Sequence, residues 1–262
     1  MRETFFLHDI EDFVFRRGDT LREPRFRTPT GGLEQFDLVI ANPPFSLNPW
    51  GRDVWADDPF GRSRFGIPPA TKGDYAFVEH MLTVMRPETG RLAVVMPQRV
   101  LFRTGAEREI RQNILAAGLL EAIIALPPNL FYNTSLPACV LVCRAEISQQ
   151  RREHVLFIDA SLRFVKAGAR NVMQADDIET VVAAYRSGND PDGEGGLAVR
   201  LVPLSEIESN DWDLSVARYL AGAETDAVEV SFALAEYVDA REELREAEDR
   251  LDDRLREAGF LV

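Results

Sequence analysis

The stretch Phe36–Phe45 constrains the fold of this chain more than any other part of the sequence. Its residues Leu38–Ala41 form an apolar, branched run of the kind that makes a short buried strand. The run ends at Asn42–Pro44, because proline donates no N–H to a sheet and forces the residue before it to be extended. The pattern predicts a strand that delivers a rigid polar turn to the carboxyl end of an α/β sheet, where open sheets bind ligands.

The turn offers two hydrogen-bond acceptors side by side. Asn42 has a side-chain carbonyl, and the main-chain carbonyl of Pro43 is held in direction by Pro44. Two acceptors suit an exocyclic amino group, and accepting both of its hydrogens would make the nitrogen a better nucleophile. Phe45, the next residue, could stack on a base lifted from its duplex. The alternative interpretation is a proline-rich turn that only ends a buried strand.

These residues resemble the Asn-Pro-Pro-Phe motif of amino-group DNA methyltransferases that use S-adenosylmethionine. Further stretches resemble, in the same order, parts of the modification subunit of type I restriction-modification systems, and together they cover most of the chain: Gly73–Met81, Met96–Phe102, Leu126–Thr134 and Asp211–Tyr219. The resemblance implies methyl transfer to N6 of adenine. It implies DNA and a specificity subunit as partners, with a restriction subunit as a possible third.

The resemblance also assigns roles in the transfer. Asn42 and Pro43 would hold the amino group, and Pro44 belongs to the same catalytic turn. Phe45 would hold the flipped ring, and Phe131 could complete a sandwich around it. For Phe131 the alternative is a hydrophobic plug under its loop. Such transfer needs no cysteine or histidine nucleophile and no metal, because placement and hydrogen-bond acceptance carry the reaction.

Asp19 and Leu21 are the candidates for binding the cofactor, together with Asn42. The run Phe13–Phe15 predicts a short strand, and Asp19 follows its end, where the carboxylate could accept from the adenine amino group. A Gly-Asp turn is common by itself, so this role rests on the resemblance. No glycine-rich strand–turn–helix, which a nucleoside-cofactor fold needs, precedes Asp19. We therefore expect the chain to be truncated at its amino terminus relative to the family.

Charge is distributed unevenly along the chain. The formal charge is −13, yet residues 190–262 hold 20 Asp/Glu against 7 Arg, and residues 1–189 hold 23 of each sign. The front part is therefore free to meet DNA, although it is not basic enough to bind DNA tightly alone. Cys139 and Cys143 are expected to be reduced core thiols. Without a membrane span or a signal peptide, the sequence favours a cytoplasmic protein.

The remaining pattern alternates strands and helices. Helices are expected over 74–86, 105–117 and 176–185, and strands over 92–96, 119–126, 140–143, 155–158 and 199–204, with 119–126 and 140–143 forming a hairpin. The fold class is α/β: an incomplete Rossmann-like sheet of an S-adenosylmethionine-dependent methyltransferase with a carboxyl-terminal helical extension. The expected divisions are a partial catalytic domain (1–160), an α/β extension (161–230) and an amphipathic assembly helix (231–262).

Two segments leave their role open. Residues 46–72 mix aromatic and basic residues, which suits a lid or substrate clamp, but equally a poorly ordered surface loop. The tail carries an apolar stripe on a charged helix, which favours binding to another subunit over packing on its own domain: Tyr237, Ala240, Leu244, Ala247, Leu251, Leu255 and Ala258.

The leading hypothesis is therefore the adenine-N6 methyltransferase part of a type I modification subunit. A second hypothesis is a non-catalytic assembly module that has lost cofactor binding, favoured by the missing glycine-rich turn. A third keeps the enzyme class but changes the acceptor to cytosine N4 or a glutamine amide. The resemblance along the rest of the chain argues against this third hypothesis.

Overall fold

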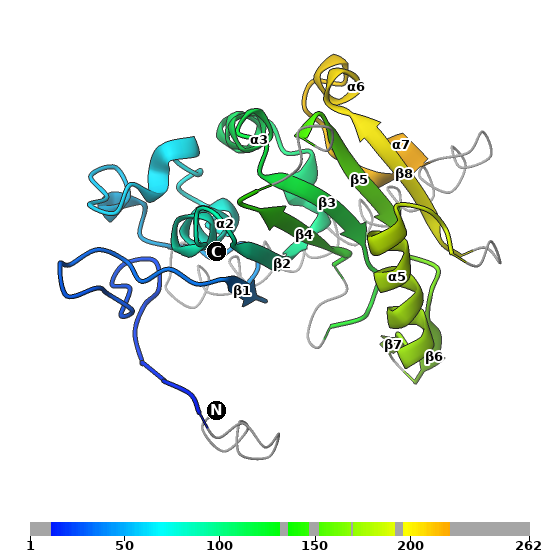
Figure 1. The fold of residues 1–262 in the computed structure, drawn as a ribbon, viewed down its shortest axis with the longest axis horizontal. Helices are drawn as coiled ribbons and strands as arrows, with labels where there is room; N and C mark the ends of the chain where they lie inside the picture. The colour runs from blue at the N-terminus through cyan, green and yellow to red at the C-terminus, as the bar shows by residue number, and fades with distance from the viewer. Residues whose placement is uncertain (1–11, 132–135, 147–151, 169, 192–195, 221–262) are drawn as a thin grey trace, which may run out of the picture. The chain divides into compact units, whose positions relative to one another are not determined.

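The computed structural model describes residues 12–131, 136–146, 152–168, 170–191 and 196–220. These residues fold around one mixed sheet with the strand order β1-β2-β4-β3-β5-β8 (Figure 1). The strands of this sheet are β1 (Leu38–Ala41), β2 (Arg91–Pro97), β3 (Leu120–Ala125), β4 (Ala138–Arg144), β5 (His154–Asp159) and β8 (Ala198–Pro203). The α/β class predicted from the sequence is confirmed.

Strand direction places several loops at one edge of the sheet. β1 runs parallel to β2, and β3 runs parallel to β5, while β4 lies antiparallel between β2 and β3. The carboxyl ends of β1, β2, β3 and β5 therefore share one edge. The turn after β1 and the loop after β3 therefore both leave the sheet at this edge. β3 and β4 form the predicted hairpin.

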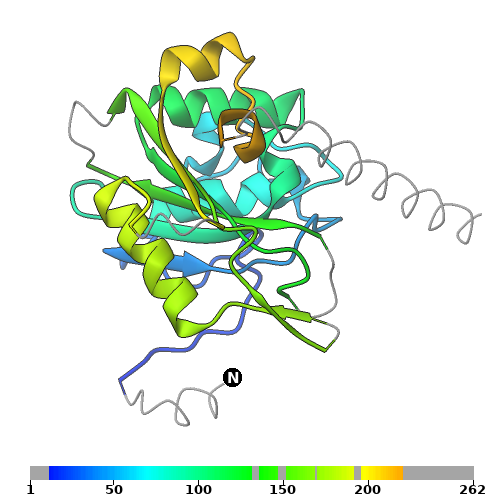
Figure 2. The same cartoon turned by 90° about the vertical axis from the view of Figure 1, so that its right-hand side faces the viewer.

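Helices cover the two faces of the sheet unequally (Figure 2). One face carries the main core, under α2 (Asp74–Val84), α3 (Ala106–Ala116), α6 (Leu204–Ser209) and α7 (Val216–Leu220). On α3 the apolar side chains of Ile110, Ile114 and Leu115 point into this core, as their spacing predicts. The other face is covered by α5 (Ala175–Ser187), which packs over β3 and β5. Helix α5 begins where the Gln174 N–H donates to Asp177 at 2.8 Å.

Strand β1 is only half buried, which corrects the expectation of a buried strand. Val39 and Ala41 pack on the main core, but Leu38 is 63% exposed and Ile40 72% exposed. β1 is an edge strand of the sheet, and α5 packs on that face over β3 and β5, away from β1. Alternate residues of a strand point to opposite faces, so only one of its two rows finds neighbours among the described residues.

The loop 46–73 is ordered and has a core of its own. Trp50 and Trp55 are buried and meet edge to face with ring centroids 5.4 Å apart. The loop contains two short 3-10 helices, η1 (Arg52–Val54) and η2 (Arg62–Phe65). Of the two alternatives, the poorly ordered surface loop is therefore wrong, because the aromatic rings bury one another. The role of the loop as a lid or substrate clamp stays a prediction.

The chain before β1 and after β5 differs from expectation in two places. Phe13–Phe15 form no strand, since none of the described strands pairs with them. A small hairpin that the sequence pattern did not predict pairs β6 (Val165–Ala167) with β7 (Arg170–Val172). The division of the chain at 160 and 230 stays a prediction, and β8 from the second predicted division pairs with β5 in the same sheet.

The predicted assembly helix at 231–262 lies outside the described residues. Within the described ranges, no helix is both long and apolar enough to span a bilayer.

Candidate active site

The turn after β1 presents free acceptors at the carboxyl edge of the sheet. Asn42 is exposed and Pro43 is buried. Among the described residues, no hydrogen bond occupies the side chain of Asn42 or the carbonyl oxygen of Pro43. Pro44 is exposed beside them, and Phe45 is half-buried. The turn is therefore fixed by its prolines and its strand, and its two acceptors remain available to a ligand.

The residue after this turn is held by the start of α2. The backbone N–H of Ser46 donates to Asp74 Oδ1 at 2.7 Å, and the N–H of Gly73 donates to the carbonyl of Leu47 at 3.1 Å. These two bonds close the base of the 46–73 loop. Gly73 is required there, because a Cβ at this position would lie 2.6 Å from Cβ of Trp50.

Asp74 belongs to a buried ionic cluster. Arg103 donates to Asp74 Oδ2 at 2.7 Å and to Glu107 Oε1 at 3.1 Å, and both carboxyl side chains are 1% exposed. The second terminal nitrogen of Arg103 lies 3.3 Å from the hydroxyl of Ser46. Burial alone would lower the pKa of Arg103, but its hydrogen bond to Asp74 and the charge of Glu107 outweigh burial and raise it. Burial raises the pKa of Glu107, against the opposing effect of Arg103.

Phe45 and Phe131 are brought together at the same edge. Their ring centroids lie 6.5 Å apart with planes at 79°, an edge-to-face contact. Two rings that sandwich a base lie parallel, so one ring would have to turn to accept a base between them. The base-binding role of the pair stays a prediction.

The loop that leads to Phe131 is supported from the small β6–β7 hairpin. Asn171 is buried on β7, and its side-chain nitrogen donates to the carbonyl of Pro128 at 2.7 Å. The Asn171 N–H donates to the carbonyl of Asn129 at 3.1 Å. These bonds fix Pro128 and Asn129, which lie three and two residues before Phe131, and so they limit where Phe131 can lie.

Asp19 and Leu21 form a tight turn before the sheet. Oδ1 of Asp19 accepts the N–H groups of Leu21 and Arg22, each at 3.0 Å. Asp19 is exposed, whereas Leu21 is buried against Trp50 and Trp55. The Leu21 side chain therefore anchors the turn, and the second oxygen of Asp19 remains for a ligand.

The two cysteines are buried thiols. Cys139 and Cys143 are free and buried, and burial raises the pKa of Cys143 to about 12. A thiol with so high a pKa is a poor nucleophile at neutral pH. Within the described ranges, no group of three His, Cys, Asp or Glu side chains could hold a metal ion.

Sequence reasoning missed the residues behind the turn. Asp74 lies 28 residues from Ser46, and Asn171 lies 43 residues from Pro128, so neither contact shows in local spacing. The available signal was a polar side chain directly at a helix start, after the glycine at 73, in a stretch that otherwise reads as apolar.

The fold and this turn define the class of protein. The sequence profile of the family described as N-6 DNA Methylase matches residues 2–227. The chain therefore belongs to the N-6 DNA methylase family.

Known relatives place the chain more narrowly. It is 33% identical to the type I restriction enzyme MjaVII methylase subunit of Methanocaldococcus jannaschii, over 91% of this chain and 39% of that protein. It is also 33% identical to the HindI methylase subunit of Haemophilus influenzae, over 79% of this chain and 47% of that one. The chain spans less than half the length of these relatives.

Solved structures agree with this placement. The type I methyltransferase subunit from Streptococcus thermophilus superposes with a TM-score of 0.72 at 35% identity, over 84% of this chain and 45% of that chain. The EcoKI M protein, at 20% identity and a TM-score of 0.56, shares the fold. The α/β sheet described above is thus that of type I methyltransferase subunits.

Proposed function

We propose that this chain supplies the site that binds the target adenine amino group in an adenine-N6 DNA methyltransferase of a type I restriction-modification system. The observation that carries the proposal is the free pair of acceptors at Asn42 and Pro43, held at the carboxyl edge of the sheet beside Phe45. Family membership and the two methylase subunits at 33% identity support the same reaction.

The chemistry follows from the acceptors. An adenine amino group would donate one hydrogen to the Asn42 side-chain oxygen and one to the Pro43 carbonyl oxygen. This arrangement localises the lone pair on N6 and directs it away from the turn, toward the methyl group that bound S-adenosylmethionine supplies. Phe45 and Phe131 would contact the flipped ring. Pro43 is a buried residue, whereas Asn42 is exposed.

The described residues fit one end of S-adenosylmethionine. The free oxygen of Asp19 can accept from the adenine amino group of the cofactor, next to the anchored Leu21. Among the described residues, no glycine-rich turn joins a strand directly to a helix, which is the feature that commonly holds the rest of such a cofactor. We therefore assign only the adenine end of the cofactor to this chain.

The proposed partners are target DNA and a specificity subunit that selects the site, with a restriction subunit as a further candidate. Relatives are named as type I methylase subunits, and a solved neighbour concerns assembly of a type I system. A non-catalytic assembly module is the second candidate, favoured by the incomplete cofactor site. It keeps the fold but predicts no dependence of any activity on Asn42.

The test is methyl transfer by the assembled complex that contains this chain. Asn42→Ala removes one acceptor, and the single-turnover rate should fall by roughly a hundredfold or more, since a donor or acceptor aimed at the reacting group is worth that much. Binding of DNA and cofactor should change less. Asn48→Ala, at another exposed asparagine in the following loop, is the matched control. Unaltered transfer by Asn42→Ala would favour the assembly module.

A further inference from the structure

We propose that Asp74 is a positioning residue for the transfer reaction, one that sets the direction of the Asn42–Phe45 turn through the backbone of Ser46; this rests on the proposed function. Asp74 touches neither acceptor directly. It acts on the chain one residue beyond Phe45, where its Oδ1 accepts the Ser46 N–H at 2.7 Å.

Hydrogen bonds hold the turn at each of its two ends. On the amino side, β1 pairs with β2 through Ala41, which lies opposite Val94. On the carboxyl side, the bond from Ser46 to Asp74 is the first contact that fixes the backbone after Phe45. Ser46 has a positive φ of 51°, which a non-glycine residue rarely adopts. A residue in that conformation needs its neighbours to hold it, and Asp74 supplies the hold.

Asp74 is itself fixed from behind. Arg103 pairs with it at 2.7 Å and is 13% exposed at the side chain, so little water competes for the ion pair. Arg103 also donates to Glu107 and lies 3.3 Å from the Ser46 hydroxyl. The ion pair with Arg103 thus holds the Asp74 carboxylate with one oxygen toward Arg103 and the other toward the Ser46 N–H.

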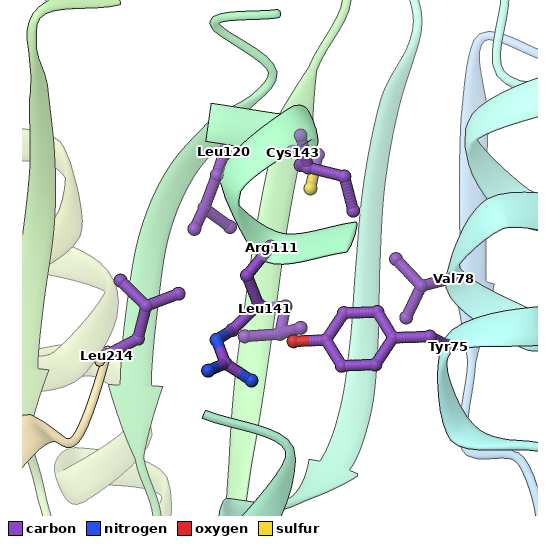
Figure 3. Close-up of a pocket in the computed structure, with 8 residues that line it drawn as sticks. Tyr75, Val78, Arg111, Leu120, Leu141, Cys143 and Leu214 are labelled. Atoms are coloured by element: carbon purple, nitrogen blue, oxygen red, sulfur yellow. The ribbon is translucent and has the colours of Figure 1, made fainter. Parts of the chain in front are cut away.

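The main chain of Arg103 is held in turn by a buried arginine. Arg111 donates to the carbonyl of Arg103 at 2.8 Å, to that of Val100 at 3.0 Å and to that of Trp212 at 3.1 Å. Figure 3 shows the Arg111 side chain reaching toward the hydroxyl of Tyr75, in a cavity of about 10 Å³. Tyr75 follows Asp74 on α2 and also donates to Val100. The residues behind Asp74 are therefore packed and bonded, not free to yield.

This arrangement predicts a loss of rate without a loss of binding. Near-attack geometry is sensitive to shifts of about 1 Å, which can cost on the order of a hundredfold in rate. Releasing Ser46 would let the turn move relative to β2 while leaving each acceptor present. The acceptors would still bind the amino group, but the lone pair of N6 would no longer be directed consistently.

Glu107 provides a matched control. It is as buried as Asp74 and pairs with the same arginine, but it has no contact with Ser46. Asp74→Ala and Glu107→Ala should both lower thermal stability. Only Asp74→Ala should lower the single-turnover transfer rate of the assembled complex, by roughly ten- to a hundredfold, with the dissociation constants of DNA and cofactor unchanged. Asp74→Asn, which keeps an oxygen acceptor, should recover most of the rate.

A second readout uses the full chain without any activity. Hydrogen exchange of the Ser46 amide, followed by NMR, should accelerate at least about tenfold in Asp74→Ala and stay near wild type in Glu107→Ala, because only the first loses the acceptor. Unchanged exchange in Asp74→Ala overturns the proposal, and so does an equal loss of rate in both alanine variants.

Asn42→Ala is run beside them to separate the two proposals. If Asn42→Ala is impaired and Asp74→Ala transfers at the wild-type rate, only the positioning role fails. If Asn42→Ala transfers normally, the proposed function fails and the positioning role fails with it.

Discussion

Arg62 donates a hydrogen bond to the carbonyl oxygen of Thr20 at 3.2 Å, and so joins the 46–73 loop to the turn that carries Asp19. The same guanidinium pairs with Asp58 at 2.6 Å and lies 4.2 Å from the ring centroid of Trp55. Both ion-pair partners are buried. The Asp19 turn is therefore shaped by the protein before any ligand arrives, because a buried cation holds its backbone from one side and Leu21 anchors it from the other.

The first prediction concerns cofactor binding by the chain alone. We propose that the Asp19 turn binds only the adenine end of the cofactor, so the isolated chain should bind S-adenosylmethionine weakly or not at all. Isothermal titration calorimetry measures this directly, with Asp19→Ala as the reference for non-specific heat. Micromolar binding that depends on Asp19 would contradict the prediction and would mean that the cofactor site is complete in this chain.

The second prediction concerns the half-exposed strand β1. Ile40 is 72% exposed, so Ile40→Ala should change the free energy of unfolding by less than about 1 kcal/mol. Ile123 on β3 is fully buried at 0% exposed, and Ile123→Ala should cost about 2–5 kcal/mol because it leaves a cavity. Urea denaturation of the two variants provides the comparison. A cost for Ile40→Ala as large as that for Ile123→Ala would show that another part of the protein covers this face.

Strand β1 also shows what sequence reasoning can reach. The run Leu38–Ala41 predicted a strand correctly, and its stop at the prolines predicted the polar turn at the carboxyl edge. Its burial could not be read from the same residues, because burial depends on the place of the strand in the sheet order. β3 has a similar apolar pattern and is buried throughout, since it lies between β4 and β5.

The 46–73 loop shows the opposite limit. It has no hydrophobic periodicity, so nothing local predicted that Trp50 and Trp55 would meet. The contact depends on the ion pair between Asp58 and Arg62 and on closure of the loop base by Asp74, which joins residues 28 apart. The acceptors of the Asn42–Phe45 turn were evident from residue type, but the residues that hold the turn became visible only through contacts distant in sequence.

The third prediction concerns the carboxyl-terminal tail, which lies outside the described residues. The apolar stripe that includes Leu251 and Leu255 is interpreted as a surface for the specificity subunit. Burying a leucine contributes roughly 1.5–3 kcal/mol, so Leu251→Asp with Leu255→Asp should abolish co-purification with that subunit. Circular dichroism of the sheet domain should persist.

The control for the tail is a change on its charged residues. Glu248→Gln with Asp252→Asn alters charge but spares the stripe, and it should leave assembly nearly intact. Normal assembly of the leucine variant would remove the tail from the interface. Unfolding of the whole chain would instead mean that the stripe packs on its own domain.

The fourth prediction starts from a buried acid that has no hydrogen-bond partner. Glu79 on α2 is 0% exposed, and neither carboxyl oxygen has a hydrogen-bond partner in the described part of the chain. Burial raises its pKa to about 8. The Phe65 N–H, the Trp55 indole N–H and the charge of Arg64 partly offset that burial, although none of them makes a hydrogen bond with the Glu79 oxygens. Glu79 is therefore protonated at neutral pH in the folded protein.

The neighbouring residue His80 affects the pH dependence of stability in the opposite direction. Burial and the charge of Arg62 lower the pKa of His80 to about 4, so His80 is neutral in the folded protein. Protonation of His80 in the unfolded chain makes the free energy of unfolding fall as pH drops from 6.5 toward 4. Ionisation of Glu79 in the unfolded chain makes the free energy of unfolding fall as pH rises from 4.5 toward 8. The two effects oppose each other below pH 6.5, and above that value Glu79 acts alone.

The free energy of unfolding should therefore decrease between pH 6.5 and 8, by up to about 1.4 kcal/mol per pH unit. The reason is that the Glu79 carboxyl ionises in the unfolded chain but stays protonated when buried in the folded protein. Glu79→Gln keeps a neutral side chain of similar size at every pH and should remove this slope. Glu88→Gln, on the exposed segment after α2, changes the same charge in water and should leave the slope in place. Urea denaturation at half-unit intervals measures all three proteins. A slope that survives in Glu79→Gln would mean that another group titrates across this range and that Glu79 is ionised in the folded chain.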